Sequence, residues 1–177
     1  MSIDATQEGL AYLAQADGTM ALNNAGADAQ ARYRAARADQ DWLERSLAGA
    51  LLAGLFLQHP WLDAVTLTFQ VSSEYDDSGG FYRSILLKAR MARPVPGRLL
   101  PEEEFPESAF DADCAACLIE EVLEDCEFDL HTGLADYPEG YDELTVSLER
   151  SPVTALLQSS PVDGSLACIA WGLTLAS

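Results

Sequence analysis

Cysteine and histidine residues offer the first candidate chemistry in this chain. Cys114-x-x-Cys117 is followed by Cys126 and His131, so four soft or borderline metal ligands fall within eighteen residues. Thiolates and imidazole at such spacing hold structural zinc, and a Cys3His site is one interpretation. In the alternative interpretation the cysteines are core residues, because buried free cysteine behaves as a small hydrophobe. Cys114 and Cys117 would then lie on the apolar face of a helix, and Cys168 would also lie in the core. The second interpretation is favoured, so we expect no metal and no other cofactor.

Residues for nucleophilic or acid–base catalysis are scarce. The chain has two histidines, and His59 precedes Pro60 at an expected helix end, where it would cap carbonyl groups. No Gly-x-Ser-x-Gly, P-loop or Rossmann glycine pattern occurs. The adjacent Glu120 and Glu121 point to different helix faces, which makes a poor acid–base pair. The sequence therefore predicts a protein that is not an enzyme.

Carboxylates are the most prominent functional groups. Asp113, Glu120, Glu124 and Glu127 are separated by seven, four and three residues, so a helix would carry them as one stripe. Neighbours at this spacing have Cβ atoms roughly 5–6 Å apart. Successive phosphates of a nucleic acid rise by about 3.4 Å per nucleotide along a winding strand. The stripe can therefore present a charge pattern that a nucleic-acid-binding groove accepts, although an ordinary solvated helix face is the alternative.

The distribution of charge favours a binding surface. Seventeen Asp and Glu residues lie between Pro101 and Glu149 with no Lys or Arg, whereas the rest of the chain has twelve acids and ten bases. An ordinary exposed helix mixes the two signs to avoid self-repulsion. A net charge of −19 also disfavours unaided binding to nucleic acid or to anionic membranes. The expected partner is a basic protein.

Two smaller clusters extend this interpretation. Glu74, Tyr75, Asp76 and Asp77 fall at an expected hairpin tip, where contact residues often lie, although Asp is also ordinary turn chemistry. If this tip and the acidic helix shared one side of the molecule, they would form a single negative surface. A second cluster holds the densest positive charge and would pair with the chain's own acids or with those of a second copy, as in a homodimer. Its members are Arg32, Arg34 and Arg37.

The elements that position these residues follow from periodicity and from turn signals. An opening helix is expected over residues 3–16, ended by Asp17-Gly18, and residues 19–27 are expected to form a loop. Asp28 would cap a long helix that ends before Pro60. The second half of this helix is apolar nearly all round, which predicts burial against a sheet. Its helically spaced apolar residues are Tyr33, Leu43, Leu47, Leu51 and Leu57.

The rest of the chain alternates between strand and helix signals. Period-two alternation over residues 65–71 and a second strand over 81–91 predict a hairpin, joined by the turn residues 76–80. A proline-rich loop leads to a helix that begins at Ser108 or Asp111. Strands are expected over residues 144–148 and 166–175. The residues expected to face the core from the helix are Phe110, Cys114, Cys117, Leu118 and Val122.

Together these elements predict a single α+β domain. Its sheet has about four antiparallel strands, with helices packed mainly on one face. The parts are a helical region at residues 1–60, a β-hairpin at 63–92, the acidic helix at 107–130 and C-terminal strands at 143–175.

The charge profile resembles in character the acidic inhibitors encoded by phages and plasmids, which include DNA mimics, antirestriction proteins and anti-CRISPR proteins. This resemblance implies binding to a basic, nucleic-acid-handling protein. Residues 1–22 lack a signal-peptide pattern and no apolar run is long enough to span a membrane, which predicts a cytoplasmic location. Three alternatives stay open: an immunity protein against a basic toxin, a structural or assembly protein with a solvated acidic face, and a Cys3His zinc protein.

Overall fold

A computed structural model describes residues 9–10, 12–75, 78–105, 109–135, 140 and 143–173. The chain divides into two compact units, Met1–Trp42 and Leu43–Ser177. The boundary between the units falls inside the long helix α1 (Asn24–Gln58). No described helix has both the length and the hydrophobicity needed to cross a membrane.

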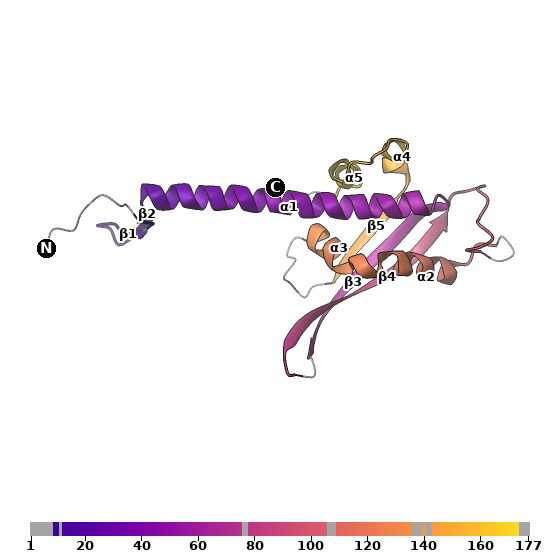
Figure 1. Cartoon of the computed structure of the whole chain (residues 1–177), viewed down its shortest axis with the longest axis horizontal. Helices are drawn as coiled ribbons and strands as arrows, with labels where there is room; N and C mark the ends of the chain where they lie inside the picture. The colour runs from indigo at the N-terminus through magenta and orange to yellow at the C-terminus, as the bar shows by residue number, and fades with distance from the viewer. Residues whose placement is uncertain are drawn as a thin grey trace. The chain divides into compact units, whose positions relative to one another are not determined.

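The first unit contains a short antiparallel hairpin, made by β1 (Tyr12–Ala14) and β2 (Met20–Leu22) (Figure 1). The Asp17 carboxylate accepts hydrogen bonds from Thr19 N at 2.9 Å and Thr19 Oγ1 at 2.7 Å, and Gly18 has a φ of +83°. The predicted helix over residues 3–16 is therefore wrong where the structure describes it, while residues 1–8 and 11 lie outside that part. Asp-Gly forms a hairpin turn here and does not end a helix.

Helix α1 begins earlier than the sequence predicted. The Asn23 side-chain oxygen accepts a hydrogen bond from Gly26 N at 2.8 Å, which is the geometry of an N-cap. Asp28 lies inside the helix, so its predicted capping role is wrong. The predicted loop over residues 19–27 is also wrong, because β2 and the first turn of α1 occupy it.

The second unit is organised around a three-stranded antiparallel sheet with the strand order β4-β3-β5. β3 (Leu62–Tyr75) and β4 (Phe81–Pro94) form the predicted hairpin, and β5 (Leu144–Glu149) pairs with the other edge of β3. The register between β3 and β4 shifts on both sides of Ala64, which pairs with Arg93, and the nearby Met91 of β4 has a φ of +52°. A bulge therefore interrupts the base of an otherwise regular hairpin.

One face of the sheet forms the core. Val65, Leu67 and Phe69 of β3 are buried, while the alternating Thr66 and Thr68 point to the other face. The same hydrophobic cluster includes residues from the second half of α1 and from the helix that follows the sheet hairpin, namely Leu52, Phe56, Ala115, Ile119 and Leu123. The predicted α+β class with antiparallel pairing is confirmed, although the sheets have two and three strands in place of four in one sheet.

The acidic segment folds as α2 (Ala112–Leu123), the 3-10 turn η2 (Glu124–Cys126) and α3 (Glu127–Leu134). The Asp111 carboxylate accepts hydrogen bonds from the N–H groups of the second and third helical residues, each at 2.9 Å, so the predicted cap is confirmed. The fully buried ridge is Ala115–Ile119–Leu123 and does not include Cys117, which is exposed. The other four predicted core residues, Phe110, Cys114, Leu118 and Val122, are partly buried against the core, so the core-facing side of α2 overlaps the predicted one but is centred on a different ridge.

The C-terminal segment is helical after β5. It forms η3 (Ser151–Val153), α4 (Thr154–Leu157) and α5 (Gly164–Ala170). The strand predicted over residues 166–175 is wrong over residues 166–173, because Asp163 caps α5 by accepting hydrogen bonds from Ser165 N and Leu166 N, while residues 174–175 lie outside the described part. A short apolar run fits a strand or a buried helix equally well, and the cap decides between them.

The second half of α1 packs closely against two later helices. Gly49 lies against the carbonyl of Gly164, and Gly133 of α3 lies against the carbonyl of Glu44, so a Cβ at any of these three glycines would clash with backbone. The remaining side of α1 is open: Leu43 is 68% exposed and Leu57 is 47% exposed. The predicted burial against the sheet therefore holds for the side of this half that carries Leu52 and Phe56, and not for its whole circumference.

Candidate acidic interface

Two of the predicted stripe residues face the sheet. Strand β4 is an edge strand, and Glu127 Oε1 accepts a hydrogen bond from Leu87 N at 3.1 Å. Glu120 Oε1 likewise accepts from Ala89 N at 3.0 Å, and its other oxygen lies 3.1 Å from Lys88 Nζ. Edge-strand N–H groups otherwise lack partners and invite pairing with another chain. Glu120 and Glu127 therefore satisfy the edge of β4 and hold α2 and α3 beside it.

The predicted stripe is thus divided between two sides of the helix. Asp113 and Glu124 are exposed, whereas Glu120 and Glu127 are half-buried against β4. The buried ridge that contains Ile119 sets this rotation, because it turns the neighbouring Glu120 toward the strand edge. The fold therefore does not present the four carboxylates as one continuous exposed row.

A different set of carboxylates points outward. We define the acidic face as the exposed carboxylates of α2, η2 and α3, which are Asp113, Glu121, Glu124, Asp125 and Asp129. Phe128 lies among them and is 60% exposed. Residues 113, 117, 121, 124 and 128 are spaced by four, four, three and four, so they follow one side of the helical segment. The sequence interpretation missed Glu121, Asp125, Phe128 and Asp129, because no local signal shows that Ala115, and not Cys117, lies in the buried ridge.

The hairpin tip is described only in part. Glu74 is exposed and accepts a hydrogen bond from the Tyr82 hydroxyl at 2.8 Å, which raises the pKa of Tyr82. The Tyr75 and Phe81 rings meet edge to face at 4.6 Å. The predicted contact residues Asp76 and Asp77 lie outside the described residues. Figure 1 shows the far end of the β3–β4 hairpin extending away from α2 and α3.

The four predicted zinc ligands have separate surroundings. The Cys114 thiol donates to the Glu104 carbonyl at 3.3 Å, and Cys117 is exposed. Burial, with smaller contributions from nearby carboxylates, raises the pKa of Cys126. His131 is buried against Arg83. Within the described ranges, no three His, Cys, Asp or Glu residues are arranged to hold a metal ion.

His59 has a different role from the predicted one. Its Nδ1 lies 3.2 Å from Glu104 Oε2, which also accepts a hydrogen bond from Trp61 Nε1 at 2.6 Å. The carbonyls at the end of α1 are capped by Arg150, whose Nη2 donates to Phe56 O at 2.7 Å and to His59 O at 2.9 Å. A cation is favourable at a helix C-terminus, and here it comes from the residue that follows β5.

The arginine cluster lies on the first unit's part of α1. Arg37 Nε pairs with Asp41 Oδ1 at 3.1 Å within the same helix. Arg32 and Arg34 are exposed. Dimerisation through these arginines stays a prediction.

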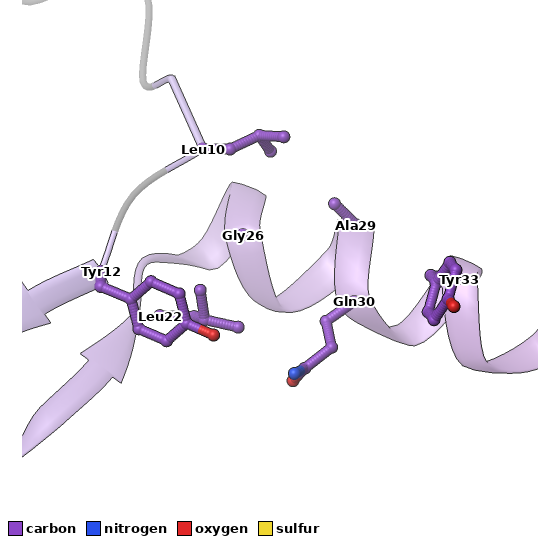
Figure 2. A pocket seen from close by; sticks show the side chains of 7 residues that line it. All are labelled: Leu10, Tyr12, Leu22, Gly26, Ala29, Gln30 and Tyr33. Atoms are coloured by element: carbon purple, nitrogen blue, oxygen red, sulfur yellow. The ribbon is translucent and has the colours of Figure 1, made fainter. Parts of the chain in front are cut away.

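The first unit also contains an open apolar pocket of about 380 Å³. Figure 2 shows that the β1–β2 hairpin contributes Tyr12 and Leu22 to it, and that the first turns of α1 contribute Ala29 and Tyr33. The full lining is Leu10, Tyr12, Leu22, Gly26, Ala29, Gln30 and Tyr33. These lining residues include no His, Cys or carboxylate, so they form no acid–base or nucleophilic arrangement.

Comparison with known proteins yields no match to a family model, to a curated protein or to a solved structure. The functional argument therefore depends on this chain's own residues.

Proposed function

We propose that this protein is an acidic inhibitor that binds a basic, nucleic-acid-handling protein through the acidic face. The observation that carries the proposal is the set of five outward carboxylates on α2, η2 and α3. Within the described part of the chain, no ion pair joins any of these five carboxylates to a base. Lys88, on the neighbouring strand, pairs instead with Glu120 on the strand side of the helix. The acidic face is therefore not neutralised from within its own fold.

Such a face suits a partner that normally binds phosphates. Unpaired carboxylates on a rigid helix produce a directed negative potential, which speeds association with a basic groove and makes it sensitive to salt. Phe128 supplies an exposed aromatic ring among the charges, and buried aromatic anchors contribute much of the energy at protein interfaces. On this proposal the protein acts in the cytoplasm, where it inhibits its partner by occupying the partner's nucleic-acid-binding groove.

An inhibition assay with matched charge reversals tests this proposal. The full chain is added to a panel of restriction endonucleases, Cas nucleases and basic nuclease toxins, and cleavage of labelled DNA or RNA is measured at about 50 and about 300 mM salt. The test variant is Glu121→Lys with Glu124→Lys. The control is Glu102→Lys with Glu103→Lys, which makes the same change in charge at two exposed positions outside α2.

We expect inhibition of at least one panel member. It should weaken about tenfold or more in the test variant and at the higher salt concentration, and much less in the control. If only a toxin is inhibited, the protein is an immunity protein, which would bind its basic target through the same acidic face. A wild-type chain that leaves every enzyme fully active at large excess, or equal potency in the two variants, would contradict the proposal.

A further inference from the structure

The open side of α1 within the second unit carries an uncharged apolar strip. We define the α1 strip as Leu43, Leu47, Ala50, Gly54 and Leu57, whose spacing alternates between four and three residues. Leu43, Leu47 and Leu57 are 68%, 46% and 47% exposed. Leu52 and Phe56, on the opposite side of the same helix, are fully buried in the core. The strip therefore has the periodicity of a helix–helix seam. Ala50, at its border, lies beside Gly164 of α5, while the exposure of Leu43, Leu47 and Leu57 leaves most of the strip open in the described chain.

Gly54 is the independent observation that indicates a close partner. The other glycines in the helices of this unit each leave room for a neighbouring backbone, because a Cβ would clash at Gly49, Gly133 or Gly164. A Cβ at Gly54 would meet nothing within 4 Å. Glycine in a helix interior is less stable than alanine, so a glycine over open space has no purpose within the described fold. Small residues in an apolar seam allow a second helix to approach closely.

We propose that a second copy of this chain docks antiparallel on the α1 strip. In that arrangement a two-fold axis passes between residues 47 and 50 of the facing helices. Leu47 then packs against Ala50 of the second copy, and Leu43 packs against Gly54 of the second copy. In each of these two contacts a leucine meets a small residue, and the symmetry repeats both contacts. This self-complementarity is what an isologous interface requires.

The chemistry of the strip favours a second copy over a basic partner. None of its five residues carries charge, although the chain has a net charge of −19. A basic protein or a nucleic acid would gain nothing electrostatically from this surface, whereas two acidic copies repel each other least where their charge is absent. The strip covers four helical turns, which is small for an interface, so we expect dissociation on the order of micromolar. The acidic face lies on different helices and does not take part.

Sedimentation velocity of the full chain tests the dimer, over about 1 to about 500 µM at about 150 mM salt. We expect a reversible monomer–dimer equilibrium. Leu47→Glu should weaken dimerisation by at least about a hundredfold, because it buries an unpaired charge against Ala50 of the second copy. Gly54→Ala should weaken it by about tenfold, because the added methyl fills the notch. Leu99→Glu is the matched control, since Leu99 is 90% exposed outside the strip, and it should leave the equilibrium unchanged.

Gly54→Ala also separates this proposal from a general loss of folding. At concentrations where the chain is monomeric, this variant should unfold at a higher temperature than the wild type, because the new Cβ lies in open space. A less stable dimer from a more stable monomer is the expected result. A chain that stays monomeric throughout the range, or a dimer that resists both strip substitutions, would overturn the proposal.

Discussion

At the scale of single residues, His131 shows how the fold controls protonation. The imidazole is 1% exposed, and its Nδ1 lies 3.0 Å from Arg83 Nη2. Burial lowers the pKa of His131, and the positive charge of Arg83 lowers it further. The neutral ring therefore accepts the hydrogen bond from the guanidinium and lies edge to face against Phe69.

This geometry predicts a contribution to stability that depends on pH. The folded pKa lies below the unfolded value of about 6.5, so the unfolded state binds more protons as the pH falls. The free energy of unfolding should therefore decrease when the pH is lowered from about 7.5 to about 5.5. His131→Asn places an amide oxygen near the position of Nδ1, so it keeps an acceptor for Arg83 and removes the titration. Urea unfolding of both proteins at the two pH values measures the difference, and an identical pH dependence would exclude this role.

At the scale of elements, α5 is held against the second half of α1 by close backbone contact. A Cβ at Gly164 would clash with Ser46 O and Ala50 N. Arg45 donates to the carbonyl of Leu173, and the Cys168 thiol donates to the carbonyl of Arg45 at 3.2 Å. The same burial raises the pKa of Cys168, which keeps this thiol protonated.

Glycine substitutions should reveal which contacts between helices are tight. Gly164→Ala should reduce the free energy of unfolding by about 2–3 kcal/mol, because a methyl group cannot fit between the two backbones. Gly54→Ala should instead increase the free energy of unfolding of the monomer by about 0.5–1 kcal/mol, because alanine is more stable than glycine inside a helix. Urea unfolding at low micromolar protein concentration checks both values. Equal effects of the two substitutions would show that the α1–α5 contact is looser than described.

Local signals predicted some elements well. The β3–β4 hairpin followed from strict alternation over residues 65–71, and the start of α2 followed from Asp111, whose carboxylate caps the helix. The rotation of α2 could not be predicted, because Cys117 and Ala115 are both plausible core residues and only the facing surface selects between them. Likewise, Glu120 gives no local sign that it will bond to a strand thirty residues earlier.

At the scale of the whole molecule, unbalanced charge opposes compaction. The 29 acidic and 10 basic residues leave many carboxylates to repel one another, and folding concentrates this charge. Among the described residues, the base–acid pairs that salt would weaken are mostly exposed, such as Arg37–Asp41, and each contributes little. Screening should therefore favour the folded state overall.

Salt should consequently stabilise this protein. Raising NaCl from about 10 to about 150 mM shortens the Debye length from roughly 30 to roughly 8 Å. We expect the free energy of unfolding in urea to rise by about 1 kcal/mol. The rise should be smaller in the Glu121→Lys, Glu124→Lys variant, which carries less negative charge. Unchanged or reduced stability at higher salt would mean that favourable ion pairs outweigh the repulsion.

The sequence by itself determined where the negative charge lies, which segments form the sheet hairpin and where α2 begins, because these depend on composition and on contacts between near neighbours. Only the tertiary structure decided which carboxylates are free. One residue around an α-helix is a rotation of about 100°, so packing of Ala115, Ile119 and Leu123 in the core turns Glu120 and Glu127 toward β4 and leaves Glu121 outward. That rotation depends on the complementary surfaces of sheet and helix, which lie far apart along the chain.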